Sequence, residues 1–489
     1  MLNPLDFPIA AGPFAPTVES LATFQCPDWF RDAKFGIWAH WGPQSVPMFG
    51  DWYARSMYLQ GNDQYRYHCR KYGHPSKFGY KDILQLWKAE NFDPAGLMDL
   101  FVESGAKYFV AQAMHHDNFD NFDSKWNEWN STKIGPRRDI CAEFQREAKR
   151  CGLPFGLTEH LAASYTWFAT SHGADKTGPY AGVPYDGADP RFASLYREND
   201  SETLHENWYT LNEKYHQDWL RRMTDVIEKF APDLFYSDGE MPFHDYGFRM
   251  VAHLYNTSAA HNGGVNNAVY NFKQQQGDTH HLDTTPGITK IGVLDYERGT
   301  AETASAEPWQ DDTAIGDWFY DVRAKYKSVP EITDTLVDAV AKNGNLLLSF
   351  PQKPDGTIDD ETLFILKNIG VWCKQNGDGI YGTRPYKKAV EGTAKHKGGA
   401  FQEGAVAFTS EDFRFTRKGN TIYAFQMRES SEGRATIKTL GRLYEQEIVR
   451  VTIGGQPVQF AQKDGALLVE TPANPQPGLA RSIACELAG

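Results

Sequence analysis

The chain has 489 residues, which is too long for one ordinary domain, and 41% of them are hydrophobic, enough for a large core. Its 63 acidic and 50 basic residues give a formal net charge of −13 at pH 7, which argues against nucleic acid or another polyanion as the partner. No stretch approaches the roughly 20 consecutive apolar residues of a membrane-spanning helix. We therefore expect a soluble protein of two or three domains that binds neutral ligands.

The cysteines indicate neither a metal site nor a redox motif. The six are spread widely, and none falls in a CxxC or Cys/His spacing. Free thiols are the expectation, with a Cys141–Cys151 bridge as the alternative. The sequence shows no basic and apolar leader at residues 1–4, which leaves the compartment open at this point.

Strand-like and helix-like runs alternate through most of the chain. Residues 1–24 are rich in Pro and Ala and are predicted to form an extended lead-in. Strands are predicted at 34–43, 106–114, 154–160, 233–238, 268–273, 291–297 and 344–350, while 315–320 fits no pattern clearly. Helices are predicted from Asp93 onward and at 140–151, 204–230, 332–341 and 361–374. This alternation is typical of a (β/α) TIM-like barrel of seven or eight strands, here placed at 25–380.

The pattern changes after residue 380. Short, often alternating runs are separated by Gly, Asn and Asp, at 405–408, 421–426, 435–439, 447–453, 459–460 and 467–470. No helical stretch interrupts them. We expect residues 381–489 to form a C-terminal antiparallel β-sandwich.

Polar side chains stand where the predicted barrel strands end. The run from Pro232 to Gly239 is apolar until it reaches Asp238, and a barrel builds its active site at the carboxyl ends of its strands. A single carboxylate there could equally cap a helix or lie in a loop. Six such positions together favour a catalytic site: His40, His115, His116, His160, Asp238 and Glu297.

Asp238 and Glu297 are the best candidates for a catalytic pair. They end strands that are two apart in the predicted order, so they can flank one bond. Glycoside cleavage needs two carboxyl groups, one that attacks or steers water and one that protonates the leaving oxygen. An ion pair between Glu297 and the adjacent Arg298 is the alternative.

The histidines permit two interpretations. His115, His116 and Asp238 could bind a metal, but neighbouring strand residues point to opposite faces, and no HxH or HExxH spacing is present. Neutral histidines that donate to sugar hydroxyls, beside Trp38, Trp41 and Trp52, are the favoured interpretation.

Several motifs taken together resemble the α-L-fucosidases of glycoside hydrolase family 29. These are KFGIWAHWG at 34–42, MHHDNF at 114–119, Asp238-Gly239 at a strand end, NGNLLL at 343–348 and PDGTI at 354–358. The combination is highly specific, although each piece alone is weak. The resemblance covers about residues 25–385, and the tail looks like that family's usual C-terminal β-sandwich.

The resemblance implies a retaining enzyme that removes α-L-fucose from a fucosylated oligosaccharide or glycoconjugate without a cofactor or metal. Asp238 matches the family's nucleophile, and Glu297 is our candidate for the acid/base. His40, His115, His116 and Trp52 would line the fucose subsite. The further substrate-binding candidates are Trp41, Asp51, Glu159, His160, Lys273 and Trp309. A periplasmic or secreted location is implied, with a leader removed.

The chain departs from many relatives at four places. Thr158-Glu159-His160 replaces a Tyr-Tyr-Ser stretch, and Asp51 replaces a longer glutamate. Lys273 stands where relatives often have arginine, which keeps the charge but not the two-pronged geometry. Gln310 replaces a glutamate of some relatives and so removes a rival acid. These differences bear on substrate preference rather than on the reaction.

Two other functions stay open at this stage. One is a metal-dependent barrel hydrolase that uses His115, His116 and Asp238. The other is a sugar-binding protein on an inactive barrel. The sequence sets neither the fucosyl linkage that is cut nor the oligomeric state.

Overall fold

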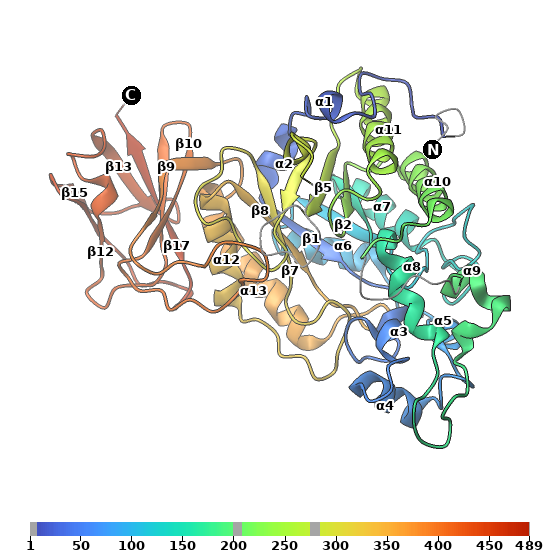
Figure 1. The fold of residues 1–489 in the computed structure, drawn as a ribbon. Coiled ribbons are helices and arrows are strands. Elements are labelled where there is room, and N and C mark those ends of the chain that lie inside the picture. Colours follow the sequence, from blue (N-terminus) through green and yellow to red (C-terminus); the bar gives the residue numbers. More distant parts are fainter. Residues whose placement is uncertain (1–6, 199–207, 274–283, 489) are drawn as a thin grey trace.

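The chain folds into a barrel with two further sheets beside it (Figure 1). A computed structural model describes residues 7–198, 208–273 and 284–488. The C-terminal sheets, orange to red in Figure 1, lie next to helices α12 and α13. No helix of the described residues is long and apolar enough to cross a membrane.

Eight parallel strands close the barrel in chain order, with β8 hydrogen-bonded to β1. The strands are β1 (Phe35–Ala39), β2 (Tyr108–Met114), β3 (Phe155–Glu159), β4 (Leu234–Ser237), β5 (Val269–Lys273), β6 (Val293–Asp295), β7 (Trp309–Ala314) and β8 (Gly344–Ser349). Most are buried along their whole length, which explains their continuous apolar runs. The predicted barrel is confirmed, with eight strands.

The seventh strand was the least visible in the sequence. The doubtful run 315–320 lies beyond the strand, which occupies Trp309–Ala314 instead. Its sequence WQDDTA carries four polar side chains that are all buried, with Asp312 facing Tyr236 and Asp311 accepting from the Gly299 amide on the other face. A strand whose interior side chains are carboxylates does not present an apolar pattern, because the signal depends on burial of apolar groups.

Helices cover the barrel, and their ends follow ordinary capping chemistry. The long ones are α6 (Pro94–Glu103), α7 (Ile140–Arg150), α10 (Glu213–Phe230), α11 (Asp245–His261), α12 (Val329–Ala341) and α13 (Asp360–Asn376). The shorter ones are α1 (Val18–Leu21), α2 (Asp28–Ala33), α3 (Tyr53–Ser56), α4 (Asp63–Lys71), α5 (Tyr80–Leu86), α8 (Ser164–Trp167) and α9 (Ala193–Tyr196). Asp93 caps α6 as predicted, and its carboxylate accepts from the Gly96 amide.

One predicted helix begins later than expected. The prediction placed its start near residue 204, but α10 starts at Glu213, because Asn212 caps it by accepting from the Tyr215 amide. Residues 204–207 of that prediction lie outside the described residues.

The C-terminal part is antiparallel, as predicted, and has its own apolar core. A six-stranded sheet contains β9 (Arg384–Glu391), β10 (Phe413–Lys418), β11 (Thr421–Gln426), β13 (Ile448–Ile453), β14 (Gln456–Pro457) and β17 (Arg481–Leu487). A three-stranded sheet contains β12 (Arg434–Ile437), β15 (Phe460–Gln462) and β16 (Leu467–Glu470). The strand predicted at 405–408 is wrong, because that segment is irregular and pairs with no strand.

Buried ion pairs join the C-terminal sheets to α12. Arg414, on β10, is fully buried and its Nε lies 2.5 Å from Asp338 Oδ1. Arg428 donates to both oxygens of Asp334, at 2.9 and 2.5 Å. Such fork-shaped pairs fix orientation as well as distance, so the sheets are held firmly on the barrel. The six cysteines are free thiols.

Candidate active site

Two carboxylates and one lysine meet at the carboxyl ends of three consecutive strands. Asp238 directly follows β4, Lys273 is the last residue of β5, and Glu297 comes two residues after β6. Lys273 Nζ lies 2.5 Å from Asp238 Oδ1 and also contacts Glu297 Oε2. Because one nitrogen touches both groups, their nearest oxygens are no more than about 5 Å apart. This is below the roughly 6.5–9.5 Å of an inverting glycosidase pair and compatible with the roughly 5–5.5 Å of a retaining pair.

Arg298, the alternative ion-pair partner predicted for Glu297, contacts other groups. The Arg298 guanidinium lies 5.0 Å above the Trp318 ring and donates to the Gly316 carbonyl at 3.1 Å. Within the described residues, the ion pair of Glu297 is made by Lys273.

Asp238 is held as an anion by its neighbours. His116 Nε2 and His160 Nε2 lie 3.4 and 3.8 Å from its Oδ2, and the Tyr236 hydroxyl lies 3.3 Å from its Oδ1. Burial favours a higher pKa for this carboxyl, but the Lys273 ammonium and the two histidines outweigh burial and hold the pKa well below its usual range. An ionised carboxylate of this kind is suited to nucleophilic attack.

The pKa of Glu297 is shifted in the opposite direction. Burial raises the pKa of Glu297 to about 7, and the nearby charges of Asp312 and Asp238 act in the same direction against the Lys273 ammonium. The group is therefore substantially protonated near neutral pH. Two adjacent carboxyl groups with divergent pKa values are the arrangement that separates a nucleophile from a general acid.

Three buried histidines form a cluster beside Asp238. Ring nitrogens of His40, His115 and His160 lie within 4.8 Å of one another. Burial and their mutual proximity lower the pKa of each ring, so the cluster is neutral. Neutral imidazoles can bind a metal or hydrogen-bond to sugar hydroxyls. The residues of this cluster differ from the predicted metal trio, which contained His116 and Asp238.

The tautomer of His115 follows from a residue that the sequence prediction omitted. Gln44 donates its amide nitrogen to His115 Nδ1 at 2.9 Å, and its own oxygen accepts from the Ala54 amide at 3.2 Å. Because the second bond fixes the orientation of the Gln44 amide, Nδ1 is an acceptor and the proton of the neutral ring lies on Nε2. His115 thus presents one N–H donor, while His116 donates its Nδ1 to the His160 carbonyl at 2.6 Å.

Aromatic rings surround the polar cluster. Trp52 is 37% exposed, stacks on Trp208 with ring centres 5.8 Å apart, and meets the edge of His116. Trp318 and Phe319, from the loop after β7, pack on His40 with ring centres 5.4 and 4.7 Å away. These rings give the site an apolar wall.

Asp51 also belongs to this end of the barrel. Its Oδ1 accepts from the Trp52 amide at 2.7 Å. Burial and the neighbouring Asp317 raise its pKa well above the usual range, and the charges of Asp238 and Glu297 add to the effect.

Three predicted substrate-binding residues lie away from this cluster. Trp41 packs against Trp87 and Phe92 and donates to the Lys353 carbonyl. Glu159 accepts from the Leu161 and Ala162 amides and from Trp219, so it caps a short helical turn. Trp309 packs on Ala339 and donates to the Lys342 carbonyl. The structure does not bring these three together with the catalytic pair, and we leave them out of the proposed subsite.

Sequence reasoning also missed contributors. Tyr236 lies on β4 two residues before Asp238, which directly follows the strand, and residues two apart share a face, so this tyrosine was predictable. Its hydroxyl also lies 3.2 Å from Asp312. Trp208, Trp318 and Phe319 lie in irregular segments, where no local pattern indicates the direction of a side chain.

The position of Lys273 leads to a prediction about pH dependence. Its ammonium lowers the pKa of both Asp238 and Glu297. Lys273→Met should therefore move both limbs of the pH profile of kcat/KM to higher pH, whereas Lys273→Arg, which keeps the charge, should move them much less. Profiles of the three proteins on an aryl glycoside that the enzyme cleaves test this. Limbs that stay in place in Lys273→Met would show that the lysine does not set these ionisations.

Comparison with known proteins points to one family. The family profile described as Alpha-L-fucosidase matches residues 5–378. The chain is 26% identical to human tissue alpha-L-fucosidase over 484 residues, which covers 94% of this chain and 88% of that protein. It is 26% identical to human plasma alpha-L-fucosidase over 471 residues, which covers 94% of this chain and 88% of that protein. The structure of Thermotoga maritima alpha-fucosidase in complex with fucose aligns with a TM-score of 0.72 at 25% identity, over 96% of this chain and 100% of that one.

Proposed function

This chain belongs to the α-L-fucosidase family of glycoside hydrolases, and on that premise we propose that it releases terminal α-L-fucose from fucosylated glycans by a retaining double displacement. The observation that carries the proposal is the Asp238–Lys273–Glu297 arrangement, in which one carboxyl is held ionised and the other is poised near neutrality.

In the first step Asp238 attacks the anomeric carbon of the fucoside. The bond from that carbon to the leaving oxygen breaks, and Glu297 transfers its proton to this oxygen. The product is a β-fucosyl ester of Asp238. For this step Glu297 must be protonated and must exchange its contact with Lys273 for one with the leaving oxygen.

In the second step Glu297, now a carboxylate, takes a proton from water as the water attacks the same carbon. The ester bond to Asp238 breaks, α-L-fucose leaves, and Glu297 is protonated again. Two inversions give net retention.

The remaining residues have roles in binding. His40, His115, His116 and His160 offer ring nitrogens to the sugar hydroxyls, with Asp51 and Lys273 nearby. Trp52 gives one apolar face, and Trp318 and Phe319 give another against which the C6 methyl of fucose can pack. A periplasmic or secreted location remains a prediction from the family resemblance.

The experiment that tests the reaction is hydrolysis of an aryl α-L-fucoside followed by proton NMR. We expect the α anomer of fucose to appear first. First release of the β anomer would contradict retention. Activity should persist in a strong chelator, and its loss there would favour a metal-dependent hydrolase instead. Absence of turnover together with measurable fucose affinity would favour the binding-protein alternative.

The pKa values predict the pH profile of the free enzyme. Glu297 must be protonated to act as an acid, so kcat/KM should fall as pH rises through about 7, by about tenfold for each further pH unit. On the acid side, the pKa of Asp238 lies well below its usual range. Asp238 therefore stays ionised at acidic pH, and activity should persist there. Glu297→Gln should lack the alkaline limb. If that limb survives in Glu297→Gln, another group supplies the proton.

A further inference from the structure

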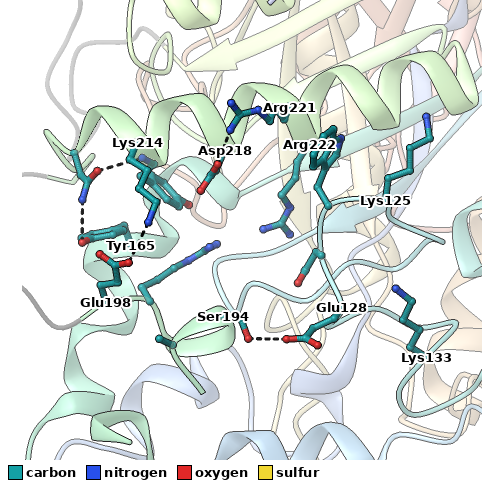
Figure 2. Close-up of a pocket in the computed structure, with 16 residues that line it drawn as sticks. Lys125, Glu128, Lys133, Tyr165, Ser194, Glu198, Lys214, Asp218, Arg221 and Arg222 are labelled. Atoms are coloured by element: carbon teal, nitrogen blue, oxygen red, sulfur yellow. Dashed lines mark hydrogen bonds and ion pairs between the residues drawn. The ribbon is translucent and has the colours of Figure 1, made fainter. Parts of the chain in front are cut away.

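A cavity lies apart from the Asp238–Glu297 cluster, which contributes none of its lining residues. It has a volume of about 550 Å³, within the roughly 300–1,000 Å³ of small-molecule sites. Its walls come from the segment 125–133, from α9 and the two residues that follow it, and from the start of α10 (Figure 2). Figure 2 shows Lys214 on one side and Lys125 and Lys133 on the opposite side.

The cavity is cationic in a protein whose net charge is −13. Six basic side chains line it: Lys125, Lys133, Arg197, Lys214, Arg221 and Arg222. The acidic ones are Glu128, Glu198 and Asp218. Two of these acids already pair with lining cations, since Glu198 lies 3.2 Å from Lys214 and Asp218 lies 2.8 Å from Arg221. Lys125 and Arg222 also have carboxylate partners outside the lining, Asp225 at 3.2 Å and Asp120. Arg197 and Lys133 therefore remain against Glu128, and the charge left over is weakly positive.

Arg197 lines the cavity and is held by uncharged partners. Its Nη2 donates to the Asn118 amide oxygen at 2.6 Å, and its guanidinium lies 4.8 Å above the Tyr215 ring. No carboxylate of the described residues forms an ion pair with it, although burial is strong enough to lower its pKa. A half-buried guanidinium without a counter-ion is costly, and an anion that enters the cavity would reduce that cost.

Hydrogen bonds connect the side chains beside Arg197. Arg222 is 4% exposed and donates to Asn118 at 2.5 Å and to buried Asp120. Asn118 therefore holds both guanidinium groups through one amide oxygen. This arrangement fixes the cationic wall before any ligand arrives, which lowers the entropy lost on binding.

An exposed aromatic ring completes the site. Trp126 lines the cavity and is 60% exposed, so its face is available to stack on a sugar ring. We propose that this cavity binds an anionic saccharide unit, a sugar that carries a carboxylate or a sulfate ester, with its charge at Arg197 and Lys133 and its ring on Trp126. The site would let the protein hold an acidic glycan through residues separate from the Asp238–Glu297 cluster.

The test is titration calorimetry with three probes that lack fucose: methyl α-N-acetylneuraminide, galactose 3-sulfate and neutral lactose. Because none can be hydrolysed by a fucosidase, the result does not depend on the proposed reaction. We expect one or both anions to bind and lactose not to. Binding should weaken about tenfold or more in Arg197→Met, since a hydrogen-bonded charge is lost, and should weaken at about 0.5 M salt. Binding of one probe alone identifies carboxylate or sulfate as the preferred anion.

Substitutions of exposed side chains test the cavity without disturbing the fold. Lys133→Met and Trp126→Ala alter exposed side chains and should each weaken anion binding severalfold, with unchanged thermal unfolding and unchanged hydrolysis of an aryl α-L-fucoside. Arg417→Met, on the distant strand β10, is the matched control and should bind as the wild type does. The proposal is overturned if neither anion binds, if lactose binds equally well, or if the cavity variants bind like Arg417→Met.

Discussion

Asp238→Ala is expected to lower kcat/KM for an aryl α-L-fucoside by more than about 10³-fold, because the group that forms the covalent bond is removed. An activated leaving group should not compensate, since it needs no acid but still needs a nucleophile. Initial rates of wild type and variant, with thermal unfolding to verify the fold, give the comparison.

Adding azide to Asp238→Ala tests whether the missing group is the nucleophile. A small anion can occupy the space left by the Asp238 carboxylate and attack the anomeric carbon directly in one displacement. The product should be β-fucosyl azide, with inverted configuration, identified by NMR. Formation of the α azide in Asp238→Ala would mean that another nucleophile still acts, and Asp238 would lose its assigned role. Asp51→Ala is the matched control, because it removes a nearby carboxyl group that we assign to binding rather than to attack, and it should give no β azide.

Glu297→Ala is expected to show a strong dependence on the leaving group. Loss of the general acid should lower kcat/KM by about 10²–10⁴-fold on a natural fucoside, whose alkoxide leaves poorly, and by much less on an aryl fucoside. Steady-state rates on both substrates, measured for wild type and variant, give the ratio that decides the role.

Azide again separates the roles. In Glu297→Ala the proposed nucleophile Asp238 remains, so azide should attack the fucosyl-enzyme and give α-fucosyl azide, with retained configuration and a higher rate. Equal losses on both substrates would contradict the assignment. Unchanged activity on the natural fucoside would transfer the acid role to another carboxyl group, for which Asp51 is a candidate because the charges of Asp238 and Glu297 contribute to its raised pKa.

Much of the fold was predictable because burial leaves a local trace. Strands β2, β4 and β8 are buried along their whole length and appear as apolar runs, and Asp93 with Pro94 marks the start of α6. Strand β7 is an exception to this pattern, since its buried side chains include the carboxylates of Asp311 and Asp312. Carboxylates inside a barrel are held by partners distant in sequence, such as Tyr236 for Asp312, and no local pattern encodes such partners.

The site was predictable to the level of the strand end but not of the side-chain direction. His40 and Trp41 are neighbours, yet one faces the histidine cluster and the other the outer core. Likewise, His160 faces Asp238, whereas its neighbour Glu159 accepts a hydrogen bond from Trp219. Adjacent residues diverge at the end of a strand, and the turn that follows decides which of them faces inward.

The sequence by itself determined the alternation of strand and helix, the polar residues at the strand ends, the motifs that carry the family resemblance and the identity of the two candidate carboxyl groups. Only the tertiary structure decided how these groups behave. Lys273 bridges Asp238 and Glu297 because β4, β5 and β6 are adjacent in a closed barrel, and that contact together with burial sets the two pKa values apart. Charge and burial act through space, so chemistry that depends on them is fixed only when distant strand ends come together.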